Sequence, residues 1–112
     1  MSDLMVVLVT ASSQEEATDI ATDLVSTMLA ACVNVVPGVT SVYRWEGKVQ
    51  HSQEWLLVIK SRRDVLDALV QRVQAVHSYG LPEIIAFPLT GGSDDYLHWL
   101  DREIRGSSHS PD

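Results

Sequence analysis

Three short runs of this chain are apolar at odd and even positions alike, and this pattern constrains the fold more than any other feature. The runs are Leu4–Val9, Trp55–Ile59 and Ile84–Phe87. Successive side chains of a strand point to opposite faces of a sheet, so each run predicts a strand with two apolar faces. A sheet built from such strands has to be covered on both sides.

Two stretches at helical spacing lie between these strands. The first helix is predicted over residues 12–31, because Ser13 followed by Glu16 has the pattern of a capping box and apolar residues then recur at helical spacing. A second helix is predicted to start at Ser61 and to continue over residues 61–76.

The segment between the two helices is rich in β-forming residues. Cys32–Val36 predicts a strand that stops at Pro37-Gly38. Val39–Trp45 and Lys48–Lys60 are two further strand-like runs, and Glu46-Gly47 between them predicts a tight hairpin turn. The first half of the last run is mostly polar, so we expect that half to project beyond the core.

The remaining elements complete an α+β pattern. Glu83–Leu89 predicts a last strand at a sheet edge, and a final helix is predicted over Tyr96–Ile104. The order is therefore β-α-β-β-α-β plus a C-terminal helix, which is the split-βαβ, ferredoxin-like arrangement. We expect one domain over residues 1–105 and a disordered polar tail over residues 106–112.

The two apolar faces of the strands predict a homo-oligomer. In this topology both long helices pack on the same face of the sheet. The bare second face would expose several hundred Å² of apolar surface, more than a soluble monomer usually exposes. A second copy of the sheet is the simplest cover, and the alternative is that the short final helix suffices.

Charge and cysteine content limit the partners and the compartment. The net charge is −7, and no cluster of Lys and Arg is found, so we expect no nucleic-acid partner. Cys32 is the only cysteine, which excludes an intramolecular disulfide and is consistent with a reducing compartment. The first apolar run stops at Val9, too short to span a membrane. We therefore expect a cytoplasmic protein without a membrane partner.

Motifs of common enzymes do not occur in the chain. The sequence contains neither the GxSxG pattern of a nucleophile elbow nor the GxxxxGK pattern of a phosphate-binding loop. It also offers no close pair of ligands for structural zinc. The sequence thus favours a protein that is not an enzyme.

Several long motifs resemble one family. The segment Ala30–Lys48 closely resembles the signature of the CutA family, the divalent-cation tolerance proteins. Leu57–Lys60, His77–Ile85 and Tyr96–Leu100 resemble further motifs of that family, in the same order. The similarity extends over nearly the whole chain, and these motifs are far more specific than a lone glycine pattern.

The resemblance implies a ferredoxin-like fold in a tight homotrimer, with long hairpin arms that embrace neighbouring subunits. It also implies a role in copper and divalent-cation tolerance. The family trimer resembles those of PII signalling proteins, which bind small effectors between subunits. One loop departs from the family pattern of His-Pro-Tyr followed by a polar residue, since it reads His77-Ser78-Tyr79-Gly80 here.

Cys32 and His77 are the candidate metal ligands, because thiolate and imidazole suit a soft or borderline metal such as copper. A small buried thiol is the alternative for Cys32. His51 on the polar hairpin and His98 on the last helix are expected at the surface, and His109 lies in the tail.

Aromatic and charged residues of the motifs form a second candidate site. Four of the seven aromatic residues lie there: Tyr43, Trp45, Tyr79 and Trp99. They predict a subunit interface or, as the alternative, the wall of a pocket for a small effector. Lys60 and Glu83 are expected either to pair with each other or to bind an anionic or amine-bearing effector at a subunit junction.

Three functions therefore follow from the sequence. The leading hypothesis is a trimeric, non-enzymatic divalent-cation tolerance protein that binds copper or another divalent metal weakly through His77. The second is a PII-like trimeric sensor that binds a small effector in clefts between subunits. The third is a structural trimer that docks to a protein partner.

Overall fold

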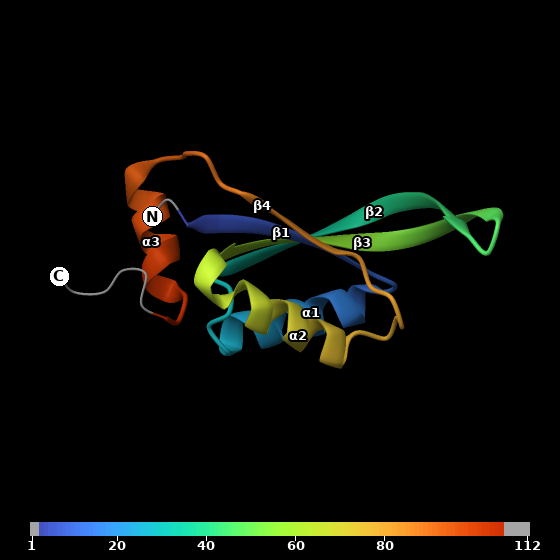
Figure 1. The fold of residues 1–112 in the computed structure, drawn as a ribbon, viewed down its shortest axis with the longest axis horizontal. Helices are drawn as coiled ribbons and strands as arrows, with labels where there is room; N and C mark the ends of the chain where they lie inside the picture. The colour runs from blue at the N-terminus through green and yellow to red at the C-terminus, as the bar shows by residue number, and fades with distance from the viewer. Residues whose placement is uncertain (1–2, 107–112) are drawn as a thin grey trace.

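The computed structural model describes residues 3–106, and it has the predicted order of elements (Figure 1). The helices and strands are β1 (Leu4–Ala11), α1 (Gln14–Ser26), β2 (Cys32–Trp45), β3 (Lys48–Arg62), a short 3-10 helix (Arg63–Val65), α2 (Leu66–Val76), β4 (Ile84–Pro88) and α3 (Asp94–Glu103). The predicted α+β class is confirmed. From residue 107 onwards, the predicted tail lies outside the described residues.

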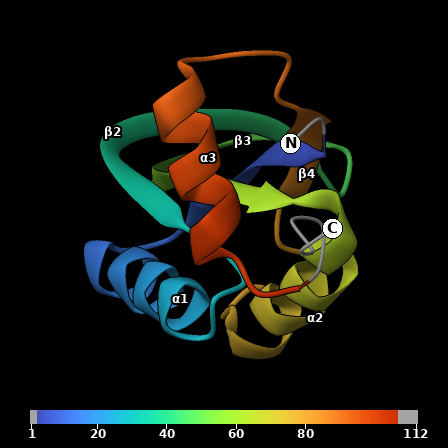
Figure 2. The ribbon, with the colours of Figure 1, turned by 90° about the vertical axis from the view of Figure 1, so that its left-hand side faces the viewer.

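All strand pairs are antiparallel, and the sheet order is β2-β3-β1-β4. The strands β1 and β3 are central, and β4 is at an edge, as predicted. Helices α1 and α2 cover one face of the sheet, whereas α3 stands across its end (Figure 2). This is the ferredoxin-like arrangement with an added C-terminal helix.

The core lies between the sheet and helices α1 and α2. Val7 pairs with Ile59, and Val9 pairs with Leu57, so these four side chains share the inner face of the sheet. All four are fully buried, and they belong to one apolar cluster with Ile20, Leu24, Leu69 and Val73 of the two helices.

The outer face of the sheet is also apolar. Leu8 pairs with Val58 and with Ile85, and Val6 pairs with Phe87, so their side chains point away from α1 and α2. Ile85 is 53% exposed and Phe87 is 45% exposed in the single chain. The predicted second apolar face is therefore present, and α3 leaves much of it uncovered.

The prediction that a strand stops at Pro37-Gly38 is wrong. Val36 pairs with Leu56 and Val39 pairs with Glu54, so two residues of β2 face the single residue Trp55 of β3. This is a β-bulge, and Gly38 supplies it with a φ of +78° that other residues rarely adopt. The strand therefore continues through the bulge.

Beyond the bulge, β2 and β3 form a two-stranded arm over residues 39–54. The partner strand β1 ends at Ala11, which pairs with Trp55, so the arm extends past the rest of the sheet (Figure 1). Glu46 and Gly47 both have positive φ, as a type I′ hairpin turn requires. The predicted turn and the predicted projection of the polar half are confirmed.

Helix α1 ends earlier than the predicted limit near residue 31. It stops at Ser26, because Met28 adopts a left-handed conformation with a φ of 61°. The backbone N–H groups of Leu29 and Ala30 then donate to the carbonyl oxygen of Leu24, which closes the helix end.

The prediction that a helix starts at Ser61 is also wrong. Ser61 belongs to β3 and is buried, and its hydroxyl donates to the carbonyl oxygen of Leu29 at 2.6 Å. The α-helix begins only at Leu66, after the 3-10 turn. Ser61 therefore does not cap a helix. Its hydroxyl instead provides a hydrogen bond to a carbonyl group in the connection between α1 and β2.

Arg62, the next residue, joins the end of β3 to the end of α3. Its side chain is completely buried and pairs with the carboxylates of Asp64 at 2.6 Å and Asp101 at 3.2 Å. The guanidinium also donates to the carbonyl oxygens of Asp101, Ile104 and Arg105. A cation suits this position, because carbonyl groups at a helix C-terminus carry partial negative charge.

Candidate functional site

His77 lies at the end of α2, and both of its ring nitrogens are engaged. Nε2 lies 2.7 Å from the carbonyl oxygen of Thr10, and Nδ1 lies 3.1 Å from the backbone nitrogen of Tyr79. A carbonyl oxygen only accepts and a backbone N–H only donates, so the neutral ring carries its proton on Nε2. A metal ion at His77 would have to displace one of these two partners.

Cys32 lies at another level of the sheet. It opens β2 opposite Lys60, which pairs in turn with Val6, whereas His77 contacts Thr10. Four residues of β1 separate these levels, which corresponds to about 13 Å along the strand. One chain therefore does not bring the two predicted ligands together.

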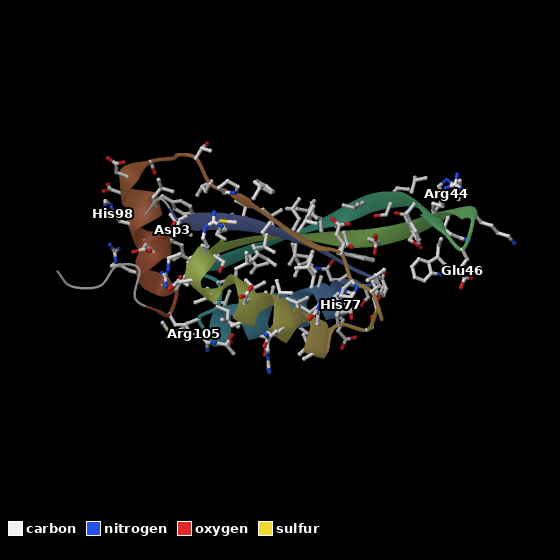
Figure 3. All side chains as sticks on the ribbon, in the orientation of Figure 1. Asp3, Arg44, Glu46, His77, His98 and Arg105 are labelled. Carbon is white, nitrogen blue, oxygen red and sulfur yellow. The ribbon has the colours of Figure 1, made fainter. Side chains whose placement is uncertain are left out.

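His51 and His98 are exposed and lie on different elements. His51 lies on the arm and His98 on α3, as predicted, and Figure 3 shows His98 at the end of the molecule opposite the arm tip with Arg44 and Glu46. His109 lies outside the described residues. Among residues 3–106, no three His, Cys, Asp or Glu side chains gather closely enough to hold a metal ion.

Glu16 links the start of α1 to the loop after α2. Its carboxylate accepts hydrogen bonds from the backbone N–H groups of Ser78 at 2.7 Å and Ser12 at 3.2 Å, and it lies 3.8 Å from Nδ1 of His77. Burial opposes ionisation of Glu16, but the bonds from Ser78 and Ser12 outweigh it and lower its pKa to about 2. The carboxylate thus fixes the loop that carries Tyr79.

A groove of about 730 Å³ lies between the arm and this loop. Four residues predicted for an effector or subunit pocket line it: Tyr43, Trp45, Tyr79 and Glu83. The other two predicted residues lie elsewhere. Lys60 donates to the side chain of Asn34, and the ring of Trp99 packs on Tyr96 within α3, with 5.7 Å between ring centroids.

Glu54 also lines the groove, and the sequence analysis missed it. The hydroxyl of Tyr79 donates to its Oε2 at 2.8 Å. Burial, this hydrogen bond and the negative charge of Glu54 raise the pKa of Tyr79 to about 12. The sequence does contain an indication that Glu54 has a special role. Glu54 is in phase with Leu56 and Val58 of the apolar outer face, where a carboxylate is unusual.

Within residues 3–106, no helix has the length and apolar character that a transmembrane span requires.

Comparisons with known proteins point to one family. The family model described as CutA1 divalent ion tolerance protein matches residues 5–103. Protein CutA, chloroplastic, of Arabidopsis thaliana is 52% identical over 90% of this chain. The divalent-cation tolerance protein CutA of Thermus thermophilus is 50% identical, and the match covers 90% of this chain and 97% of that protein.

Solved structures give the same result. The crystal structure of CutA1 from Oryza sativa matches with a TM-score of 0.91 and 50% identity, over 94% of this chain and 96% of that one. The chain spans only 56% of the length of the Arabidopsis protein.

Proposed function

The chain belongs to the CutA1 divalent ion tolerance family, and from that premise we propose that it acts in divalent-cation tolerance as a cytoplasmic homotrimer. In this proposal the trimer binds copper or another divalent cation weakly and catalyses no reaction. The family model and the Thermus relative are named for divalent ion or cation tolerance, and none of the relatives described above is named for a reaction.

The apolar outer face of the sheet is the observation that carries the assembly. Ile85 and Phe87 are about half exposed in the single chain, and Val36 of β2 is also exposed on this face. Such a surface is typical of contacts between subunits. The arm supports the same conclusion, because a two-stranded hairpin is only marginally stable without further contacts.

The weakness of metal binding follows from the surroundings of the candidate ligands. His77 holds Thr10 and Tyr79 with its two ring nitrogens, so a Cu(II) ion competes with existing hydrogen bonds. The Sγ atom of Cys32 lies 4.0 Å from the ammonium group of Lys60, whose positive charge opposes a cation there. The net charge of −7 attracts cations to the surface as a whole.

The test combines sedimentation with calorimetry. We expect sedimentation velocity to give a trimer with and without one equivalent of Cu(II), and calorimetric titration to give one saturable, weak site per subunit. His77→Asn keeps an acceptor for Tyr79 but removes the imidazole, so it should abolish that site.

His98→Asn is the matched control, since His98 is an exposed histidine on α3. It should leave copper binding unchanged. A folded monomer, or a copper isotherm that is the same in His77→Asn as in the wild type, would contradict the proposal.

The groove supports a second candidate function, a trimeric sensor of a small effector. Four of the six residues predicted for such a pocket line the groove. A cleft with aromatic walls and few polar groups is typical of small-molecule sites. If this function holds, a metabolite should stabilise the trimer against heat while Cu(II) has no effect.

A further inference from the structure

The charges that line the groove between the arm and the 79–83 loop limit the kinds of ligand that can bind there. Two carboxylates line it, Glu54 and Glu83, together with three aromatic rings, and no Lys, Arg or His side chain is among the lining residues. A cleft lined by one sign of charge attracts ligands of the opposite sign. The groove therefore selects against phosphates and carboxylates and in favour of cations.

Glu54 has an oxygen available for such a cation. The residue is only 6% exposed, and its Oε2 accepts the hydrogen bond from Tyr79. Among residues 3–106, no donor is found for Oε1, and no basic side chain forms an ion pair with this carboxylate. No fully buried side-chain N or O atom among residues 3–106 lacks a hydrogen-bond partner, so Oε1 is open to the groove that Glu54 lines. A ligand cation that donates to Oε1 would form a charge-assisted hydrogen bond there.

The walls of the groove distinguish an organic cation from a metal ion. Divalent cations such as Ca²⁺ take six to eight oxygen ligands, and copper prefers nitrogen or sulfur. The groove offers two carboxylates without a third His, Cys, Asp or Glu close by in the described part of the chain. Tyr43 and Trp45 instead supply aromatic faces, which attract ammonium groups and cover alkyl chains.

We propose that this groove binds a primary ammonium compound. In the complex, the ammonium group donates to Oε1 of Glu54, Glu83 adds negative charge at the rim, and Trp45 covers the alkyl chain. This ligand class would be the effector of the sensing function proposed above, and the two proposals share only the groove. It does not depend on copper binding.

The three tryptophans make a direct test possible. The indole N–H signals of the native protein are followed by NMR while n-butylammonium chloride is added at constant ionic strength, and n-butanol serves as the neutral control. We expect the Trp45 signal, assigned with Trp45→Phe, to shift saturably, with an affinity for butylammonium about 10-fold or more above that for butanol. The signals of Trp55, bonded to Gln14, and of Trp99 on α3 should stay in place.

Variants locate the charge that is responsible. Glu54→Gln should lower the affinity for butylammonium by about 10-fold or more, the usual effect of losing a hydrogen bond to a charged group. Glu103→Gln removes the same charge from the exposed face of α3 and should leave the affinity unchanged.

Three results would overturn the inference. One is equal binding of butylammonium and butanol by the wild type, a comparison that needs no variant. Another is equal binding of butylammonium by the wild type and Glu54→Gln. The third is absence of butylammonium binding by the wild type together with loss of the trimer in Glu54→Gln, because Glu54 would then serve a contact with a second copy rather than a ligand.

Sedimentation of the same samples separates the two proposals. A protein that is not a trimer contradicts the proposed assembly. A trimer that ignores butylammonium contradicts only the ligand assigned to the groove.

Discussion

Glu16 shows how one side chain can serve two parts of a fold. The backbone N–H of Glu16 donates to the hydroxyl of Ser13 at 3.1 Å, which is the N-cap that the sequence predicts. Its carboxylate turns back to Ser12 rather than to Ser13, and it also accepts from Ser78, 62 residues later. The local sequence pattern predicts the contact between Glu16 and Ser13, but it gives no information on the contact with Ser78.

The lowered pKa of Glu16 leads to a prediction on pH and stability. Its folded-state pKa is about 2, below the usual 4.5, so its stabilising effect is complete above pH 4.5 and is lost as the pH falls towards 2. At pH 7, Glu16→Gln should lower the free energy of unfolding by about 1–3 kcal/mol. This difference from the wild type should shrink between pH 4.5 and 2.

Urea unfolding at a series of pH values, at one protein concentration, measures this difference. Glu15→Gln is the control, because Glu15 is exposed in the same helical turn. A difference between wild type and Glu16→Gln that stays constant down to pH 2 would contradict the assigned role of the carboxylate.

The candidate site was only partly predictable from single residues. Glu83 and the aromatic residues are predicted because they lie in long motifs, and all of them except Trp99 line one groove. Position at a strand end predicts that Lys60 lies near Glu83, yet the strand register puts Lys60 opposite Cys32 and its ammonium group donates to Asn34. Glu54 was missed because it closes a polar run, and its burial depends on a loop that is distant in sequence.

At the scale of elements, strands and their turn were predicted better than the places where elements change direction. The hairpin turn follows from Glu46-Gly47 and the flanking alternation. Pro37-Gly38 gives the same local signal as a strand end, and only pairing with Trp55 makes it a bulge. The early end of α1 depends on the left-handed conformation of Met28. A glycine would be the usual sequence signal for that conformation, and none is present at this position.

The hairpin turn gives a prediction at this scale. Gly47 has a φ of +79°, so Gly47→Ala should lower the free energy of unfolding by about 1–2 kcal/mol. Glu46 has a φ of +51°, which asparagine tolerates better, so Glu46→Asn should raise it by up to about 0.5 kcal/mol. Chemical unfolding at matched protein concentration tests both, and equal effects of the two changes would contradict the type I′ geometry.

At the scale of the molecule, the arm and the apolar outer face are only partly covered by other parts of the single chain. The molecule measures 53 × 25 × 23 Å, and its length comes from an arm with which no other strand of the described residues pairs beyond Trp55. The sequence predicts a sheet with two apolar faces, because a strand that is apolar at odd and even positions has two apolar faces in any topology. It could not predict which part of the outer face α3 would cover.

The outer face gives a prediction for the proposed trimer. Phe87→Lys places a charge on the face that we assign to the subunit contact, so it should shift sedimentation from trimer to monomer or to aggregates. Val25→Lys is the matched control, because Val25 lies on α1, away from this face, and is 43% exposed against 45% for Phe87. Retention of the trimer in Phe87→Lys would contradict the assignment of this face.

The position of Arg62 also has a consequence for the order in which the protein is made. The ribosome adds Arg62 well before residues 101–105, whose carbonyl groups and carboxylate surround its guanidinium in the folded chain. During synthesis, Arg62 therefore has the carboxylate of Asp64 as a partner but lacks the partners from residues 101–105 until the last helix has emerged. A chain cut short before Asp101 would lack these partners of Arg62, so the end of its sheet should be less stable than in the complete chain.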